Sequence, residues 1–321
     1  MALLARSALL LVIVLVTLSA YLRLDHSGIG CEPWPACYGN IGVPSESPSA
    51  AGTYARLLEE ASEPLSWATP LHRLVASILG LLVLGMALLS LQQRKNRPIA
   101  FSLLALTVFL AWLGIYSEGL HSPAVVMGNL SGGFAMLGLL GWMVVGKKQS
   151  GATDSNTLRK ASLAALVVLS VQILLGGLTS ANFAASACQT LPDCHGGWWP
   201  GPEISTAFDL SRVHETGATG MVLGGAERAG IHKMHRIAAI LAAMAILFAG
   251  VTAIRLGRDL RIIGVTVVAL VATEFSLGVA AVITRLPIGV AVAHNWIAAL
   301  LLLAVLKLLA DSQAHTDSEL I

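Results

Sequence analysis

Residues 71–91 read LHRLVASILGLLVLGMALLSL, an unbroken apolar run that opens on a histidine and an arginine. A helix of about 20 residues is long enough to cross the roughly 30 Å hydrocarbon layer of a membrane. Over the whole chain of 321 residues, 55% are hydrophobic and only 12% are charged. This composition predicts an all-α polytopic membrane protein that lies in the lipid bilayer.

Further apolar runs of spanning length occur along the chain. The predicted transmembrane helices, eight in number, lie near residues 5–23, 70–91, 99–117, 124–146, 161–183, 232–254, 262–283 and 289–310. Arg6 opens the first run, which ends in Leu18-Ser19-Ala20, so a cleaved signal peptide is an alternative for this segment. We favour a retained span, because its removal would leave the two halves of the chain unequal.

The distribution of positive charge predicts the orientation. The short connections 92–98, 146–160 and 255–261 are basic, which places them and both termini in the cytoplasm. The long loops 24–69 and 184–231 then lie on the outer face. The net charge of +2 is spread over short loops and forms no basic patch, so no nucleic-acid partner is expected.

All four cysteines lie in the two outer loops. The stretches CEPWPACYG at 31–39 and CQTLPDCHG at 188–196 share the pattern C-x3-P-x-C-x-G. An oxidising compartment permits one disulfide in each loop. Four free thiols are an alternative, and a zinc site is disfavoured because its halves would have to meet across separate loops.

The two halves of the chain resemble each other. LHRLVASILG at 71–80 matches MHRIAAILAA at 234–243, in addition to the matching cysteine loops. The repeat predicts two pseudosymmetric four-helix bundles, residues 1–146 and 161–321, joined by a cytoplasmic linker at 147–160. An even number of spans in each half places the repeat axis along the membrane normal, which disfavours a transporter with inverted repeats.

Histidines inside the predicted spans are candidate metal ligands. A membrane histidine is often only a packing residue, but ionisable residues in spans also mark functional sites. His235 and His294 fall at similar depth on the second and fourth helices of one bundle, an arrangement that suits the axial ligands of a heme iron. Arg73 and Arg236 directly follow His72 and His235 at the outer end, where a guanidinium either binds a heme propionate or snorkels to the interface.

These stretches resemble the heme A synthase family, which oxidises a methyl group of heme O to the formyl group of heme A for cytochrome oxidase. The resemblance is carried by YLRLDHSGIGCEPWPACYG, LHRLVAS, QILLGGLTSANFAASACQTLPDCHGGWWP, IHKMHRIAA and LPIGVAVAHN. It implies an integral protein of a bacterial-type inner (plasma) membrane. It also implies a heme b in the C-terminal half, ligated by His235 and His294, and heme O as the substrate in the N-terminal half, with His72 on its iron.

The resemblance also implies roles for the cysteines and for partner proteins. Cys31 and Cys37 would form a redox-active pair that exchanges thiols or electrons with an outside partner, and Cys188 and Cys194 would form a structural disulfide. A heme O synthase is the implied source of the substrate.

The N-terminal half departs from the family pattern at two positions. The family has a glutamate three residues before the histidine, where this chain has Thr69. It has a second histidine on the fourth helix, where this chain has Asn129, or Leu130 if the halves are registered on their prolines. With His72 alone, one coordination position of a substrate iron stays open, which is the arrangement in which iron activates oxygen.

Two interpretations follow from these departures. The family activity is retained, with polar groups from loops in place of the missing glutamate; the candidates are His26, Glu63, Glu118 and His121. Alternatively, the chain is a non-catalytic heme b-binding assembly factor or an electron-transfer cytochrome. Gln172 and Glu274 are expected to hydrogen-bond neighbouring helices, and His232 is expected either to pack or to contact heme.

Overall fold

The computed structural model describes residues 1–25, 67–94, 96–116, 123–145, 155–211 and 225–312. Within these ranges the chain is helical and forms no named strand. The elements are α1 (Ala2–Asp25), α3 (Ala68–Gln93), α4 (Arg97–Tyr116), α5 (Pro123–Val145), α6 (Asn156–Ala181), the 3-10 helix η2 (Pro202–Phe208), α7 (Ala226–Leu256), α8 (Arg258–Ile283) and α9 (Ile288–Asp311).

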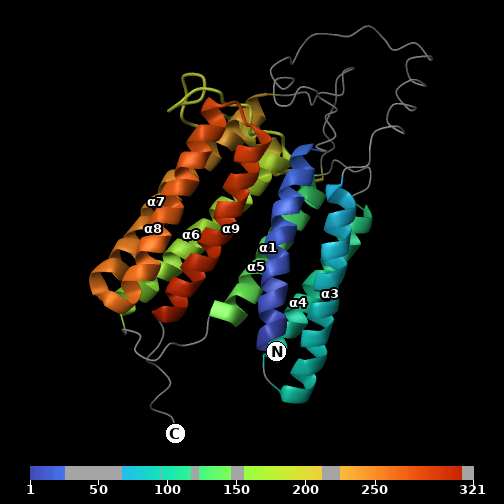
Figure 1. Ribbon diagram of the computed structural model, residues 1–321. Helices are drawn as coiled ribbons and strands as arrows, with labels where there is room; N and C mark the ends of the chain where they lie inside the picture. The colour runs from blue at the N-terminus through green and yellow to red at the C-terminus, as the bar shows by residue number, and fades with distance from the viewer. Residues whose placement is uncertain (26–66, 95, 117–122, 146–154, 212–224, 313–321) are drawn as a thin grey trace, which may run out of the picture.

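The prediction of a polytopic all-α protein is confirmed. Eight of the described helices are long and apolar enough to span a membrane, and each coincides with a predicted span to within a few residues at either end. The start of α1 and the end of α9 lie at the same end of the helices (Figure 1). Which end faces the cytoplasm stays a prediction from the basic connections.

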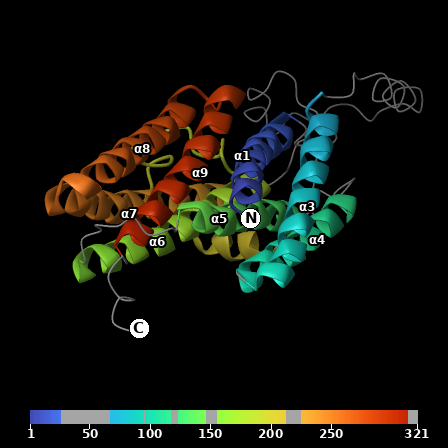
Figure 2. The same cartoon turned by 60° about the horizontal axis from the view of Figure 1, so that its bottom comes forward.

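Each set of four consecutive spans closes into a ring. In the first half α1 contacts α3 and α5, and α4 contacts the same two helices. In the second half α7 contacts α6 and α8, and α9 contacts the same two helices. The two groups stand side by side in Figures 1 and 2. The rings place α3 and α5, and likewise α7 and α9, at opposite corners.

The two rings meet through α1 and α5 on one side and α6 and α9 on the other. The contacts are α5 with α9, α1 with α9, and α5 with α6. The predicted repeat pairs α1 with α6, α3 with α7, α4 with α8 and α5 with α9. When each helix is exchanged for its partner, the same three contacts result. A pseudo-two-fold relation would produce this pattern, and the pseudosymmetry and the domain boundaries stay predictions.

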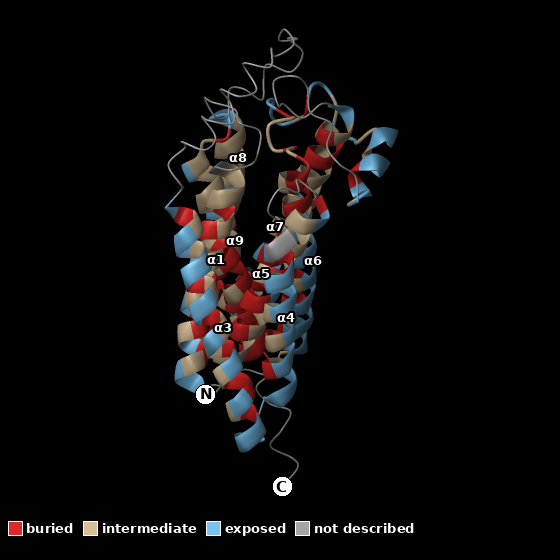
Figure 3. Ribbon diagram, turned by 90° about the vertical axis from the view of Figure 1, so that its right-hand side faces the viewer, coloured by how far each residue is buried: buried red, intermediate tan, exposed pale blue. Residues whose placement is uncertain are grey.

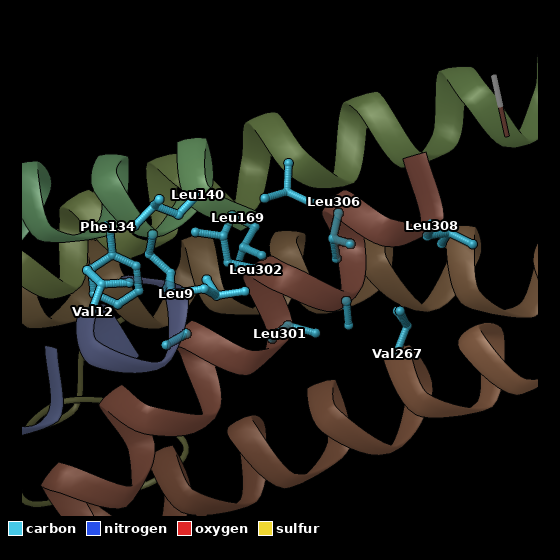
Figure 4. Close-up of a cluster of buried hydrophobic side chains, with 14 of the residues drawn as sticks. Leu9, Val12, Phe134, Leu140, Leu169, Val267, Leu301, Leu302, Leu306 and Leu308 are labelled. Carbon is cyan, nitrogen blue, oxygen red and sulfur yellow. The ribbon is translucent and has the colours of Figure 1, made fainter. Parts of the chain in front are cut away.

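The buried core lies between the helices and continues across both rings, while exposed positions lie on the outer faces (Figure 3). Figure 4 labels part of this cluster: Leu9, Val12, Phe134, Leu140, Leu169, Val267, Leu301, Leu302, Leu306 and Leu308. Leu9 and Val12 belong to α1, so the first span contributes to the core. Large apolar side chains such as Ile262 and Leu81 are exposed, as expected of a surface that faces lipid.

Small residues let neighbouring spans approach closely. A Cβ atom added to Gly264 of α8 would lie 2.7 Å from the carbonyl oxygen of Gly250 in α7, so this crossing requires glycine. Gly257 alone separates α7 from α8, with a φ of +147° that side chains disfavour. This tight turn sets α7 and α8 side by side.

Candidate functional site

The second ring places His235 on α7 and His294 on α9, at opposite corners of the four helices. Both side chains are partly buried. Two imidazoles presented from opposite corners of a helical ring are the ligand set of a six-coordinate heme iron.

His235 contacts a polar side chain of the preceding span. The Nε2 amide of Gln172 on α6 lies 3.1 Å from Nδ1 of His235 and 3.4 Å from its Nε2. The same amide donates to the carbonyl oxygen of His235 at 3.2 Å. The expectation that Gln172 hydrogen-bonds a neighbouring helix is confirmed, and its partner is the candidate ligand itself.

His294 has an equivalent neighbour. Oε1 of Glu274 on α8 lies 3.3 Å from Nδ1 of His294, which is an ion-pair distance. The two groups do not form a hydrogen bond. Among the described residues, neither Nδ1 of His294 nor Oε2 of Glu274 has a hydrogen-bond partner. The prediction that Glu274 hydrogen-bonds a neighbouring helix stays a prediction; its carboxylate lies at ion-pair distance from α9.

A glycine lies beside each of the two imidazoles. A Cβ atom added to Gly176 of α6 would lie 3.3 Å from Cε1 of His235. One added to Gly278 of α8 would lie 3.4 Å from Cε1 of His294. The first distance is tighter than most real Cβ contacts and the second is at the short end of ordinary van der Waals contact, so both rings pack closely against their glycines.

The residues present fit a heme held by two histidines. The ligand types are right, their helices stand at opposite corners, glycines leave space at the rings, and buried polar atoms beside the rings still have bonding capacity. Among the described residues there is no cluster of three or more His, Cys, Asp or Glu side chains that would suit a bare metal ion.

Arg236 is held by the loop that precedes α7. Its Nη1 donates to the carbonyl oxygens of Thr190 and Asp193 at 2.7 and 2.9 Å, and its Nη2 donates to that of Cys188 at 2.7 Å. Its Nε is buried without a hydrogen-bond partner among the described residues. The sequence predicted a propionate-binding or interfacial role and missed this anchoring of the loop.

The loop itself contains the expected bond between Cys188 and Cys194, so the structure holds a disulfide in the second half. His232, one turn before His235, is buried, and its Nδ1 lies 3.0 Å from the carbonyl oxygen of Ala184. Of the two predicted roles for His232, this contact supports packing against the loop.

The first ring, together with parts of α6 and α9, lines a partly open cavity of about 980 Å³, at the upper end of the range for small-molecule sites. It is mostly apolar, and its polar lining residues are Ser19, Arg23, Thr69, His72, Arg73, Ser77, Thr107, Asn129, Ser180 and Asn295. His72 and Arg73 therefore share one chamber. Thr69 and Asn129, where the resemblance expects a glutamate and a histidine, face the same chamber.

Arg23 is a lining residue that the sequence analysis missed, because a charged residue at the end of a span is usually interfacial. Its Nη1 lies 3.5 Å from Oγ of Ser19, and its Nε is buried without a hydrogen-bond partner among the described residues. Together with Arg73 it gives the apolar chamber two cationic groups, which favours a ligand with an anionic end.

The chamber and the histidine pair share a wall. Asn295, which directly follows His294 on α9, lines the chamber, and its Nδ2 donates to the carbonyl oxygen of Val16 at 3.4 Å. On α6, Ser180 lines the chamber one turn after Gly176, which contacts His235. The two sites are therefore neighbours across α6 and α9.

Comparison with known proteins is consistent with this geometry. A family model described as "Cytochrome oxidase assembly protein" matches residues 2–306. A heme A synthase of Shewanella oneidensis is 35% identical over 316 residues, which cover 95% of this chain and 94% of the relative. The chain belongs to the heme A synthase family. More distant heme A synthases of Rhizorhabdus wittichii and Shouchella clausii are each 25% identical, over 92% and 85% of this chain.

Several predicted site residues of this heme A synthase family member lie outside the described residues. These are Cys31 and Cys37, and the candidate loop groups His26, Glu63, Glu118 and His121. Their roles stay predictions. His72 lines the cavity of the first ring, and its role as an iron ligand stays a prediction.

Proposed function

We propose that this chain is a heme A synthase, which oxidises a methyl group of heme O to the formyl group of heme A for cytochrome oxidase assembly. The observation that carries the proposal is the large chamber that holds His72 and borders on the His235–His294 pair. With dioxygen as oxidant and oxygen source, each of the two successive hydroxylations also takes up two electrons and two protons to reduce the second oxygen atom to water, and loss of water then gives the formyl group. A substrate chamber beside an electron-carrying site suits this reaction.

In the chamber, His72 would ligate the iron of heme O, and the apolar walls would accommodate the macrocycle and its hydrocarbon tail. Arg73 and Arg23 would bind the carboxylates of the substrate, because a guanidinium pairs with a carboxylate through two parallel hydrogen bonds. The chamber walls would exclude water from the reacting methyl group. Residues 1–146 would then be the substrate half.

In the second ring, His235 and His294 would hold a heme b, which supplies one-electron transfer when bound. Arg236 braces the loop above this site, and its Nε, which has no hydrogen-bond partner among the described residues, would be available to a propionate. Residues 161–321 would be the heme b half, joined to the first by a linker at 147–160.

The outer cysteines and the membrane location complete the proposal. Cys31 and Cys37 would exchange thiols or electrons with a donor protein on the outer face, and a heme O synthase would deliver the substrate in the bilayer. The protein would lie in a bacterial-type inner membrane with both termini in the cytoplasm, as the basic connections indicate.

A second candidate function rests on the positions of Thr69 and Asn129. Both line the chamber, and neither supplies the carboxylate or the imidazole that the family pattern has there. A chain that had lost the reaction would still bind heme b through His235 and His294, and would act as an electron-transfer cytochrome or an assembly factor.

One experiment separates the two functions. The chain is expressed with a heme O synthase in cells that have no other heme A synthase, and the extracted hemes are identified by mass. Recovery of hydroxylated or formylated heme supports the synthase. One heme b per chain with no oxidised product, in aerated cells that accumulate heme O, would overturn it in favour of the cytochrome.

A further inference from the structure

We propose that Glu274 is a positioning residue for the second-ring heme, that its carboxylate accepts the Nδ1 proton of His294, and that it sets the reduction potential of the site. Gln172 would be its neutral counterpart at His235. The inference rests on the proposed heme site and deepens it, because it assigns unequal partners to the two candidate ligands.

The proton that a ligating histidine carries favours a carboxylate as its partner. A neutral imidazole that binds iron through Nε2 must carry its proton on Nδ1. A carboxylate offers only acceptors to that proton, whereas an amide offers both donors and an acceptor. Oε1 of Glu274 lies 3.3 Å from Nδ1 of His294, within reach of a proton on that nitrogen, so the carboxylate would stabilise the tautomer that leaves Nε2 available.

The combination of a polar side chain and a glycine beside a histidine occurs twice. Gln172 and Gly176 lie four residues apart on α6, and Glu274 and Gly278 lie four residues apart on α8. Residues at this spacing share one helical face. In each case the polar side chain contacts Nδ1 of a histidine on the next span, and the glycine makes room for the same ring.

The two polar partners, Gln172 and Glu274, differ in charge. Gln172 uses its amide nitrogen on the carbonyl oxygen of His235, so it is partly engaged with the backbone. Glu274 has no hydrogen-bond or ion-pair partner besides His294 among the described residues, and its Oε2 is buried. A buried carboxyl group inside a membrane span is stable in its ionised form only beside a positive centre, and an iron held by His294 would supply one.

The charge of Glu274 is expected to shift the midpoint potential of the second-ring heme in one direction. An outer partner that accepts a hydrogen bond from a ligating histidine makes that histidine more electron-donating, and such partners tune a metal site. Ferric heme carries one positive charge more than ferrous heme, so an adjacent carboxylate stabilises the ferric form. Glu274 therefore lowers the midpoint potential, and the neutral Gln172 does so less.

The test uses the full chain purified with its heme and reconstituted in lipid nanodiscs. Midpoint potentials are measured by spectroelectrochemistry for wild type, Glu274→Gln, Gln172→Glu and the double exchange Gln172→Glu/Glu274→Gln. Heme content and the low-spin absorption spectrum are recorded for each protein. Thr273→Val is the control, because Thr273 is the exposed neighbour of Glu274 on the same helix.

We expect Glu274→Gln to keep its heme and to raise the midpoint potential by about 59 mV, the value for a tenfold change in the reduction equilibrium of a one-electron couple. Gln172→Glu should lower the potential, and the double exchange should return it close to the wild-type value. A purely structural role would change heme content or stability and leave the potential in place.

The outcomes are distinguishable. A full-heme Glu274→Gln protein with the wild-type potential overturns the inference. If that variant loses its heme, Gln172→Glu decides alone, and an unchanged or raised potential there overturns the inference. A wild-type protein without a low-spin heme in the second ring instead contradicts the proposed heme site itself.

Discussion

Nη2 of Arg236 donates to the carbonyl oxygen of Cys188 at 2.7 Å, and this bond joins the disulfide loop to the helix that carries His235. Arg236 directly follows the candidate ligand His235, so one turn of α7 carries both the residue that holds the loop and the candidate heme ligand. Two more carbonyl oxygens of the loop, those of Thr190 and Asp193, accept from Nη1 of the same guanidinium.

Arg236→Leu removes all three of these hydrogen bonds and leaves the carbonyl oxygens without their donor. Because the donor is charged, we expect a loss of roughly 2–3 kcal/mol in the free energy of unfolding. Thermal unfolding followed by tryptophan fluorescence checks this, since Trp198 and Trp199 lie in the same loop. Arg255→Leu, at the exposed far end of α7, should leave the transition unchanged; an equal loss there would contradict a specific role for Arg236.

Gly176→Val and Gly278→Val place a side chain where a Cβ atom alone would lie 3.3 or 3.4 Å from Cε1 of His235 or His294. The imidazole must move, so we expect heme affinity to fall by roughly tenfold or more. Heme content is measured from the absorption spectrum after purification. Gly138→Val is the matched control, because nothing lies within 4 Å of a Cβ atom there. Full heme content in both site variants would rule out the assigned ring positions.

His72→Ala removes the candidate substrate ligand from the chamber but leaves the second ring intact. We expect loss of heme O conversion while the low-spin heme of the second ring stays at the wild-type level. Ser77→Ala changes another lining residue whose hydroxyl only donates to the carbonyl oxygen of Arg73, and it should remain active. Wild-type conversion by His72→Ala would remove His72 from the site.

Asn129→His supplies the imidazole that the family pattern has at this position. Since Asn129 and His72 line the same chamber, we expect heme O bound there to change from a high-spin to a low-spin spectrum. Electron paramagnetic resonance of the ferric protein, loaded with heme O, measures the change. Asn129→Ala should stay high-spin, and a high-spin Asn129→His protein would mean that the two positions do not face each other across the iron.

The double variant Cys188→Ser/Cys194→Ser opens the second-half disulfide. The bond closes a short loop, so its removal is expected to cost roughly 2 kcal/mol of unfolding free energy. Thermal unfolding of the variant should match that of wild type treated with reductant. A wild-type melting temperature in the variant would show that Arg236 alone holds the loop.

The spans and the candidate ligands were predictable because their signals are local. Apolar runs of spanning length locate the helices, and the repeated His-Arg pair locates His72 and His235 near the start of their predicted spans. The structure begins α7 earlier, at Ala226, so His235 lies well inside its helix. Chamber composition was only partly predictable. Arg23 resembles an ordinary interfacial arginine until α1 is placed against α3 and α5, where its side chain lines the cavity.

The sequence by itself determined the eight spans, the two-fold repeat pattern and the family, because the thickness of a membrane and the period of a helix constrain residues that are close in the chain. Only the tertiary structure decided which groups meet. Gln172 reaches His235 and Glu274 reaches His294 from separate helices, and Arg236 contacts the loop that precedes its helix. Such contacts depend on how helices rotate and pack against one another, and hydropathy along a single chain carries no information about that rotation.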